Sequence, residues 1–217
     1  MNARVPATWV RTLLIWGNAF ALAVIVTVGL IRIIGGVDLQ ILTADAGAVE
    51  AHPVAGFMSN VGILIWGACA GITLFASRLS SGWRRGFLTV GTLLTLGLAV
   101  DDAFMLHDEV LPLTGIPEEV WLFVIAAAVL AFFITRRQQI MAGPRAPMAL
   151  AILGFALMLG LDLLEPLGLL TGHAVIEEGF KLIGIVNWTI YFVLVAAAAI
   201  VDRGESRPSQ GPRAPRR

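Results

Sequence analysis

The chain has 217 residues, of which 58% are hydrophobic and only 14% are charged, and its formal net charge is zero. Soluble globular domains carry about 25% charged residues, so this composition excludes an ordinary soluble domain and indicates an integral membrane protein. Almost no polar stretch is long enough to fold separately, and we therefore expect one membrane domain over residues 1–203.

Six apolar segments are long enough to cross the roughly 30 Å of membrane hydrocarbon, which takes about 20 helical residues. None of them alternates with a period of two, and helices satisfy their own backbone groups in lipid. We therefore predict an all-α polytopic bundle of six transmembrane helices. In chain order, they cover residues 12–34, 54–77, 87–107, 119–136, 147–164 and 178–201.

Arginines mark one side of this bundle. They precede the first helix and occur in "RLSSGWRRG", in "RRQQIMAGPR" and in the tail "DRGESRPSQGPRAPRR". Positively charged connections face the cytoplasm, so we predict a cytoplasmic N-terminus and C-terminus. Residues 204–217 hold no large apolar side chain and are predicted to be a disordered basic cytoplasmic tail. Topology explains these charges, so we expect contact with membrane lipids and no nucleic-acid partner.

Carboxylates and histidines gather on the opposite, outer side. All three histidines map there, and of the 15 acidic residues only Asp202 and Glu205 fall inside. Acidic residues contribute little to topology, so the positive-inside rule does not explain this bias. We therefore expect a polar cavity of Asp, Glu, His and Lys side chains in the outer half of the bundle, between the third and sixth helices, and we look for function there.

Asp101 and Asp102 are the most unusual of these acids. If the third helix continues to Pro112, they lie about ten residues, or about 15 Å, below its outer end. A carboxylate at that depth costs at least about 2.5 kcal/mol and normally faces a partner inside the bundle. The natural partner is Lys181, the only lysine in the chain. Asp162 is a shallower candidate for an ion pair of the same kind.

Histidine and carboxylate side chains together suit zinc, manganese or iron. Glu177 lies four residues after His173, and Asp101 and Asp108 share a face of the third helix. On an ideal helix His107 points about 120° away from Asp101, so it joins them only if the helix loosens. The metal interpretation, with zinc or another divalent ion, uses His107, His173, Glu177 and Asp101 as ligands.

The stretches "DDAFMLH" and "HAVIEEGFKLIGI" resemble segments of uncharacterised bacterial multi-pass inner-membrane proteins that carry an acidic and histidine motif near the outer face. A fainter similarity, through "FMSN", His107 and His173, is to the alkaline ceramidase-like membrane hydrolases. Glu177 stands where that family has a second histidine, and six helices replace seven. The resemblance implies zinc-activated water attacking a lipid-like amide or ester, with Asp102 or Asp108 as general base.

Two other functions fit the same residues. Intramembrane carboxylates paired with Lys181 are typical of transporters or sensors that bind protons or cations, although residues 1–107 and 108–217 show no inverted repeat. The charges could instead be a salt-bridge network in a non-catalytic subunit, but interhelical polar bonds average only about 0.6 kcal/mol, which argues against stability as the sole reason. The Arg-rich, Lys-poor composition indicates a GC-rich bacterial genome and hence the inner membrane. The oligomeric state stays open.

Small and polar residues within the helices predict packing contacts. "GNAFA" at 17–21 and "GACAG" at 67–71 have the small-xxx-small spacing that lets helices approach closely. Asn18, Asn60 and Asn187 are predicted to donate hydrogen bonds between helices. Cys69, the only cysteine, is expected in the core.

Overall fold

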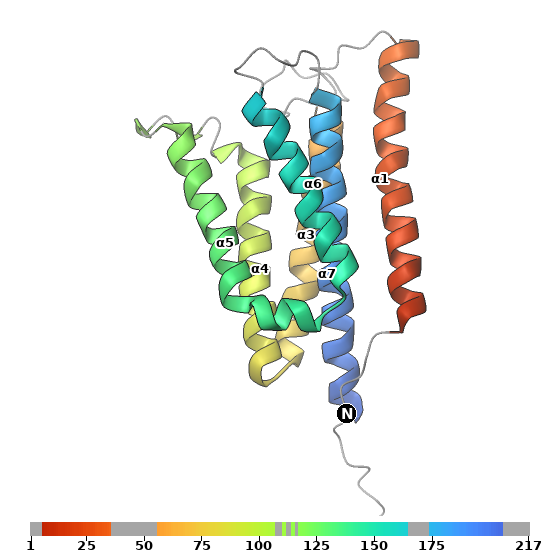
Figure 1. Cartoon of the computed structure of the whole chain (residues 1–217), viewed down its shortest axis with the longest axis vertical. Helices are drawn as coiled ribbons and strands as arrows, with labels where there is room; N and C mark the ends of the chain where they lie inside the picture. Colours follow the sequence, from red (N-terminus) through yellow and green to blue (C-terminus); the bar gives the residue numbers. More distant parts are fainter. Residues whose placement is uncertain are drawn as a thin grey trace, which may run out of the picture.

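Six helices form the described part of the chain in this computed structural model (Figure 1). The structure describes residues 6–35, 56–106, 110–111, 114–115, 117–164 and 174–205. The helices are α1 (Ala7–Gly35), α3 (Phe57–Leu79), α4 (Gly82–Phe104), α5 (Glu118–Ala142), α6 (Arg145–Leu164) and α7 (Ala174–Glu205). The predicted all-α class is confirmed.

Among the described residues, five helices are long and apolar enough to cross a membrane. They are α1, α3, α4, α5 and α7, whereas the apolar stretch of α6, Arg145–Leu161, is shorter. Many large hydrophobic side chains of these helices are exposed, as in a protein whose outer surface faces lipid. The chain is therefore a multi-pass helical membrane protein. A sixth crossing and the sides of the termini stay predictions.

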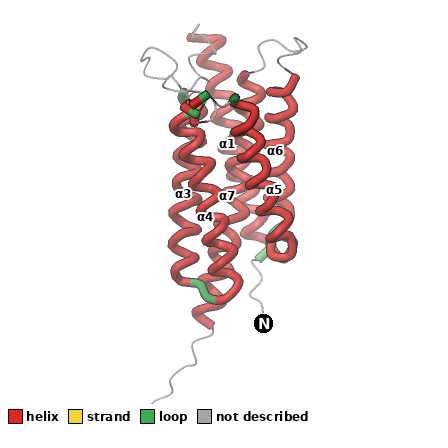
Figure 2. The backbone as a smooth tube through the Cα atoms, turned by 90° about the vertical axis from the view of Figure 1, so that its left-hand side faces the viewer, coloured by secondary structure: helices red, strands yellow, loops and turns green. Residues whose placement is uncertain are grey.

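Helix α7 is the centre of the bundle. α1, α3 and α6 pack against it, α4 packs mainly on α3, and α5 lies at the periphery with few contacts to α4 and α6. Figure 2 shows α3, α4 and α7 running side by side. α7 buries side chains around much of its circumference, among them Trp188, Tyr191 and Phe192. A helix that is apolar all round is expected at such a central position.

The two ends of the bundle differ in charge. α1 begins and α7 ends at the same end, where the short α3–α4 turn also lies (Figures 1 and 2). We call this the arginine end, because it holds Arg11, Arg78, Arg84, Arg85, Arg136, Arg137 and Arg145. The opposite, carboxylate end holds Asp101, Asp102, Glu177 and Glu178. Among the arginines whose side chains are described, Arg32 in the last turn of α1 is the exception to this segregation.

Glycines let three helices approach α7 closely. A Cβ built on Gly91 of α4 would lie 2.3 Å from Cε1 of Phe192, and one on Gly17 of α1 would lie 2.6 Å from Cδ1 of Ile190. A Cβ on Gly154 of α6 would lie 2.8 Å from the backbone nitrogen of Gly184. The close contact predicted for "GNAFA" is therefore confirmed at Gly17.

The corresponding prediction for "GACAG" is wrong for its glycines. Cβ atoms built on Gly67 and Gly71 meet nothing within 4 Å. The residues between them, Cys69 and Ala70, are the buried ones on this turn of α3. Cys69 lies about 160° around the helix axis from each of the two glycines, taking the 100° per residue of an α-helix, so the two glycines do not face the core.

Hydrogen bonds join the helices within the core, as predicted for Asn18 and Asn187. Nδ2 of Asn187 donates to Oδ1 of Asn18 at 2.7 Å, and Nδ2 of Asn18 donates back to Oδ1 of Asn187 at 3.2 Å. Trp188 of α7 donates through Nε1 to Oγ1 of Thr95 on α4 at 3.0 Å. These bonds fix the register of α1 and α4 against α7.

Helix α4 ends earlier than the sequence predicts. Met105 adopts a left-handed conformation with φ of 48°, and its N–H donates to the carbonyl of Asp101. Beyond it, Val110 N–H donates to Met105 O at 3.2 Å and Leu111 N–H to Leu106 O at 2.7 Å. These i to i+5 bonds are wider than α-helical ones. α4 therefore ends before the predicted limit at residue 107, the condition that one α-helix continues to Pro112 is not met, and Asp102 lies in the last turn of α4.

Candidate functional site

The structure brings two of the predicted site residues together at the carboxylate end. Nζ of Lys181 on α7 lies 2.5 Å from Oδ1 of Asp102 on α4. The same Nζ lies 3.5 Å from Oε1 of Glu178, one helical turn earlier on α7. The side chain of Asp102 is 9% exposed and that of Lys181 is 23% exposed. A single ammonium group is therefore shared between a buried carboxylate and a more accessible one.

The helix ends explain how these side chains meet. Asp102 lies in the last turn of α4, where the carbonyl groups of the helix end already carry a partial negative charge. A carboxylate is disfavoured there unless a cation is close by. α7 begins nearby at Ala174, and its second turn presents Lys181 to α4. Glu178 lies three residues before Lys181, on the same face of α7.

Helix α3 closes the site from a third side with small residues. A Cβ built on Gly62 would lie 3.9 Å from Oδ2 of Asp102 and 3.0 Å from Cδ1 of Ile185. Ser59, one turn earlier, is also buried. The next buried layer toward the arginine end contains Trp66, Ala99 and Ile185, all apolar. The Lys181–Asp102 pair therefore lies at the carboxylate end of the hydrophobic core, with apolar side chains on its inner side.

Negative charge dominates this end of α4 and α7. Asp101 precedes Asp102, and Glu177 precedes Glu178, so four carboxylates accompany the ammonium group of Lys181 on these two helix ends. Among the described side chains of these two helix ends, the formal charge with all five groups ionised is −3. Such a surface raises the local concentration of protons and metal cations.

The remaining predicted site residues are placed only in part. Asp101 and Glu177 are half-buried, and they precede Asp102 and Glu178 in the sequence. His107, Asp108 and His173 lie outside the described residues, and so does the side chain of Asp162 on α6. Within the part of the chain that the structure describes, no three His, Cys, Asp or Glu residues are grouped so that they could hold a metal ion. The predicted metal site, which needs His107 and His173, is therefore not tested by the described residues.

A second ion pair joins the same two helices at the arginine end. Arg84 in the first turn of α4 pairs with Asp202 in the last turn of α7. Sequence reasoning missed this pair, although Asp202 was one of only two acids assigned to the arginine-rich side. The sequence thus shows an acidic residue on the arginine-rich side, but the partner of Asp202 depends on which helices are neighbours.

The separation of the two pairs places the candidate site along the bundle. Arg84 and Asp102 are 18 positions apart on α4, which corresponds to about 27 Å of helix at 1.5 Å per residue. Lys181 and Asp202 are 21 positions apart on α7, or about 32 Å. Both lengths match the roughly 30 Å thickness of membrane hydrocarbon. If Arg84 lies at one boundary of the hydrocarbon, Asp102 lies at the other, and the depth of about 15 Å expected from the sequence is too large.

The chain belongs to the family described as a domain of unknown function, DUF8692, whose family model matches residues 18–195. This match covers α3 to α6 completely and most of α1 and α7, including Asp102, Glu178 and Lys181. No curated protein and no solved structure matches the chain. The resemblance to alkaline ceramidase-like hydrolases therefore stays a hypothesis drawn from a few sequence stretches.

Proposed function

We propose that this DUF8692 protein is a proton-responsive membrane transporter or sensor, in which the carboxylates around Lys181 take up and release a proton. The observation that carries this proposal is the sharing of Lys181 between Asp102 at 2.5 Å and Glu178 at 3.5 Å. Charged groups in membrane bundles that pair with one another commonly mark proton or ion pathways.

The geometry offers two states of the site. With Asp102 ionised, Lys181 holds α7 against α4 through the interhelical pair. With Asp102 protonated, the attraction across the interface weakens and Lys181 keeps Glu178 as its partner on its own helix. The two states differ in how firmly α4 and α7 are joined at the carboxylate end. A change in protonation is thereby converted into a change in helix packing, which is what a sensor or a coupled transporter requires.

A purely structural role accounts less well for the charges. Interhelical polar bonds in membrane proteins contribute about 0.6 kcal/mol on average. Stability would be served by the Lys181–Asp102 pair alone, whereas Lys181 also contacts Glu178 at 3.5 Å, and Asp101 and Glu177 place two further carboxylates next to these residues in the sequence. An excess of carboxylates around one lysine suits the exchange of a proton better than the fixing of a bundle.

The membrane placement is part of this proposal. The arginine end, with both termini, faces the cytoplasm, as the positive-inside rule favours. The carboxylate end then faces outward, α6 supplies the sixth crossing, and the membrane is a bacterial inner membrane. The residues around Lys181 would meet protons or cations from outside the cell.

Infrared difference spectroscopy tests proton uptake directly. The pH of the purified protein in lipid is stepped between about 4 and 9. Carboxyl groups with ordinary pKa values and those with pKa values raised by burial both titrate in this interval. We expect a protonated-carboxyl band that is reduced in Asp102→Asn and shifted in Lys181→Met. Asp202→Asn is the matched control, because it removes a carboxylate from the other ion pair of α4 and α7. A band unchanged in Asp102→Asn would overturn the proposal.

The metal-dependent hydrolase is a second candidate, favoured by one observation. The departure from α-helical geometry after Phe104 removes the constraint that turned His107 away from Asp101. In that case His107, His173, Glu177 and Asp101 would hold zinc or another divalent metal, Asp102 or Asp108 would act as general base, and a lipid-like amide or ester would be the substrate. Near-stoichiometric metal in the purified protein, lost in both His107→Ala and His173→Ala, would favour this function. Absence of metal after purification without chelator would contradict it.

A further inference from the structure

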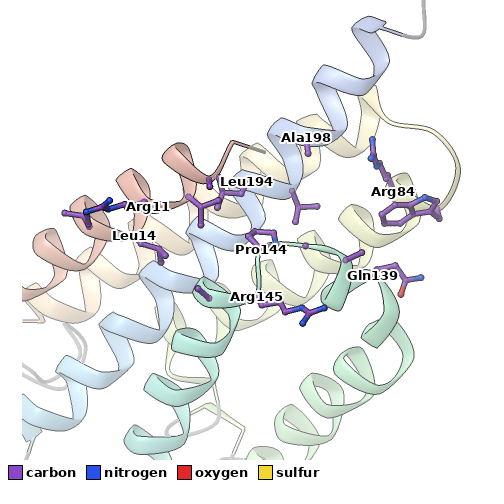
Figure 3. A pocket seen from close by; sticks show the side chains of 16 residues that line it. Arg11, Leu14, Arg84, Gln139, Pro144, Arg145, Leu194 and Ala198 are labelled. Carbon is purple, nitrogen blue, oxygen red and sulfur yellow. The ribbon is translucent and has the colours of Figure 1, made fainter. Parts of the chain in front are cut away.

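A large groove opens at the arginine end of the bundle, on the opposite end from Lys181. Its volume is about 870 Å³, within the 300–1,000 Å³ typical of ligand pockets. Figure 3 shows that it lies between α1, the turn joining α5 to α6, and α7, with the start of α4 at its edge. Its walls are mainly apolar and include Leu14 of α1 and Leu194 and Ala198 of α7.

Positive charge lies at the rim of this groove. Arg11, Arg84 and Arg145 line it. Arg84 is paired with Asp202, whereas Arg11 and Arg145 are exposed and form no ion pair among the described residues. Nε of Arg145 donates to the carbonyl of Met141 at 3.4 Å, which leaves its terminal nitrogens for another acceptor. Guanidinium groups bind phosphate in a bidentate manner, so the groove is complementary to a phosphate-bearing anion.

The packing of the helices opens the groove toward the membrane. α1 and α6 both pack on α7, but they make no substantial contact with each other. Val195 and Ala198 of α7 line the groove and are half-buried, whereas Leu194 is only 1% exposed and forms its floor. The apolar lining runs from the arginines past Leu14 of α1, in the direction that an acyl chain takes from a headgroup into the bilayer.

We propose that this groove binds one anionic phospholipid, with the phosphate of its headgroup at Arg11 and Arg145 and an acyl chain along α7 between α1 and α6. The apolar wall explains why a lipid fits better than free phosphate does. Arg11 and Arg145, which form no ion pair among the described residues, explain why an anionic lipid fits better than a zwitterionic one. This site is independent of the proton-binding role proposed for Asp102.

Native mass spectrometry of the full chain, released from mixed vesicles of phosphatidylcholine and phosphatidylglycerol, measures this preference. We expect one retained phosphatidylglycerol and a preference over phosphatidylcholine that falls roughly thirtyfold in the double variant Arg11→Gln/Arg145→Gln, since each of the two arginines near a membrane surface contributes about 1 kcal/mol. The matched control is Arg136→Gln/Arg137→Gln, which removes the same charge from the same end of the bundle outside the groove. An equal loss in this control would overturn the proposal, because the lipid would then respond only to surface charge.

A second variant separates a lipid from free phosphate. Ala198→Trp adds bulk to the groove wall without changing charge. We expect it to weaken retention of phosphatidylglycerol at least as much as the arginine variant does. If Ala198→Trp retains phosphatidylglycerol like the wild type, or if inorganic phosphate at equal concentration displaces the lipid, the groove holds no acyl chain and the proposal fails. Thermal unfolding of each variant shows that the loss does not come from misfolding.

Discussion

Arg84 at the start of α4 pairs with Asp202 at the end of α7, so these helices are joined by ion pairs at both ends. The polarity of the two pairs is opposite, since α4 supplies the base at the arginine end and the acid, Asp102, at the carboxylate end. α7 supplies Asp202 and Lys181 in the complementary order. This pattern is satisfied only when the two helices run antiparallel in the observed register. A shift by one turn would separate both pairs at once.

The first prediction concerns the stability of the Lys181–Asp102 pair. Lys181→Met leaves the carboxylate of Asp102 buried beside that of Glu178 without its ammonium partner. Breaking a buried pair on one side costs about 3–5 kcal/mol, and we expect the lower end of this range because Lys181 is 23% exposed. Unfolding in detergent, followed by tryptophan fluorescence, measures the loss.

The double variant Asp102→Leu/Lys181→Met is the control for this prediction. It removes both charges, so we expect it to be more stable than Lys181→Met alone. If the losses in the free energy of unfolding of Asp102→Leu and Lys181→Met simply add in the double variant, the carboxylate and the ammonium group do not interact energetically.

The second prediction concerns the contact between α4 and α7. Gly91→Ala places a methyl group where only 2.3 Å separates it from the ring of Phe192, and the aromatic core around that ring must shift. We expect destabilisation of about 1–3 kcal/mol, as is usual for an overpacked core. Gly97→Ala on the same helix is the control, because a Cβ there meets nothing within 4 Å. A gain in helix propensity should leave that control unchanged or slightly more stable.

The third prediction concerns the reciprocal amide pair of Asn18 and Asn187. A double-mutant cycle with Asn18→Leu and Asn187→Leu should give a coupling energy of about 0.6 kcal/mol and no more than about 1.7 kcal/mol. The value is modest because each amide also donates to a carbonyl of its own helix, Leu14 O at 2.8 Å and Ile183 O at 2.9 Å. Reversible unfolding in mixed micelles measures it. A coupling of zero would mean that the two amides act independently.

The sequence predicts the helices well because long apolar segments can satisfy their backbone in lipid only as helices. It also predicts that Lys181 needs a carboxylate on another helix, since it is the only lysine in the chain. It does not predict the end of α4, because the left-handed residue there is Met105 and not the glycine or asparagine that usually signals such a turn. The Arg84–Asp202 pair also depends on tertiary arrangement, which no local pattern contains.

The fourth prediction concerns the orientation of the bundle in the membrane. Cys69 is fully buried, so Cys69→Ala provides a background for single introduced cysteines. Ser81→Cys lies in the exposed α3–α4 turn at the arginine end, where Ser81 makes no side-chain cap bond, and Thr114→Cys is exposed toward the carboxylate end. In intact cells, a membrane-impermeant maleimide should label Thr114→Cys and should reach Ser81→Cys only after lysis. The reverse pattern would invert the proposed topology.

The same labelling decides whether α6 crosses the membrane. Ile176→Cys, at the exposed start of α7, should be labelled in intact cells, because α6 would carry the chain from the arginine end back to the carboxylate end. If Ile176→Cys is labelled only after lysis while Thr114→Cys is labelled in intact cells, α6 does not cross. Lys181 and Asp102 would then lie on opposite sides of the membrane, which contradicts the ion pair between them and the function proposed for it.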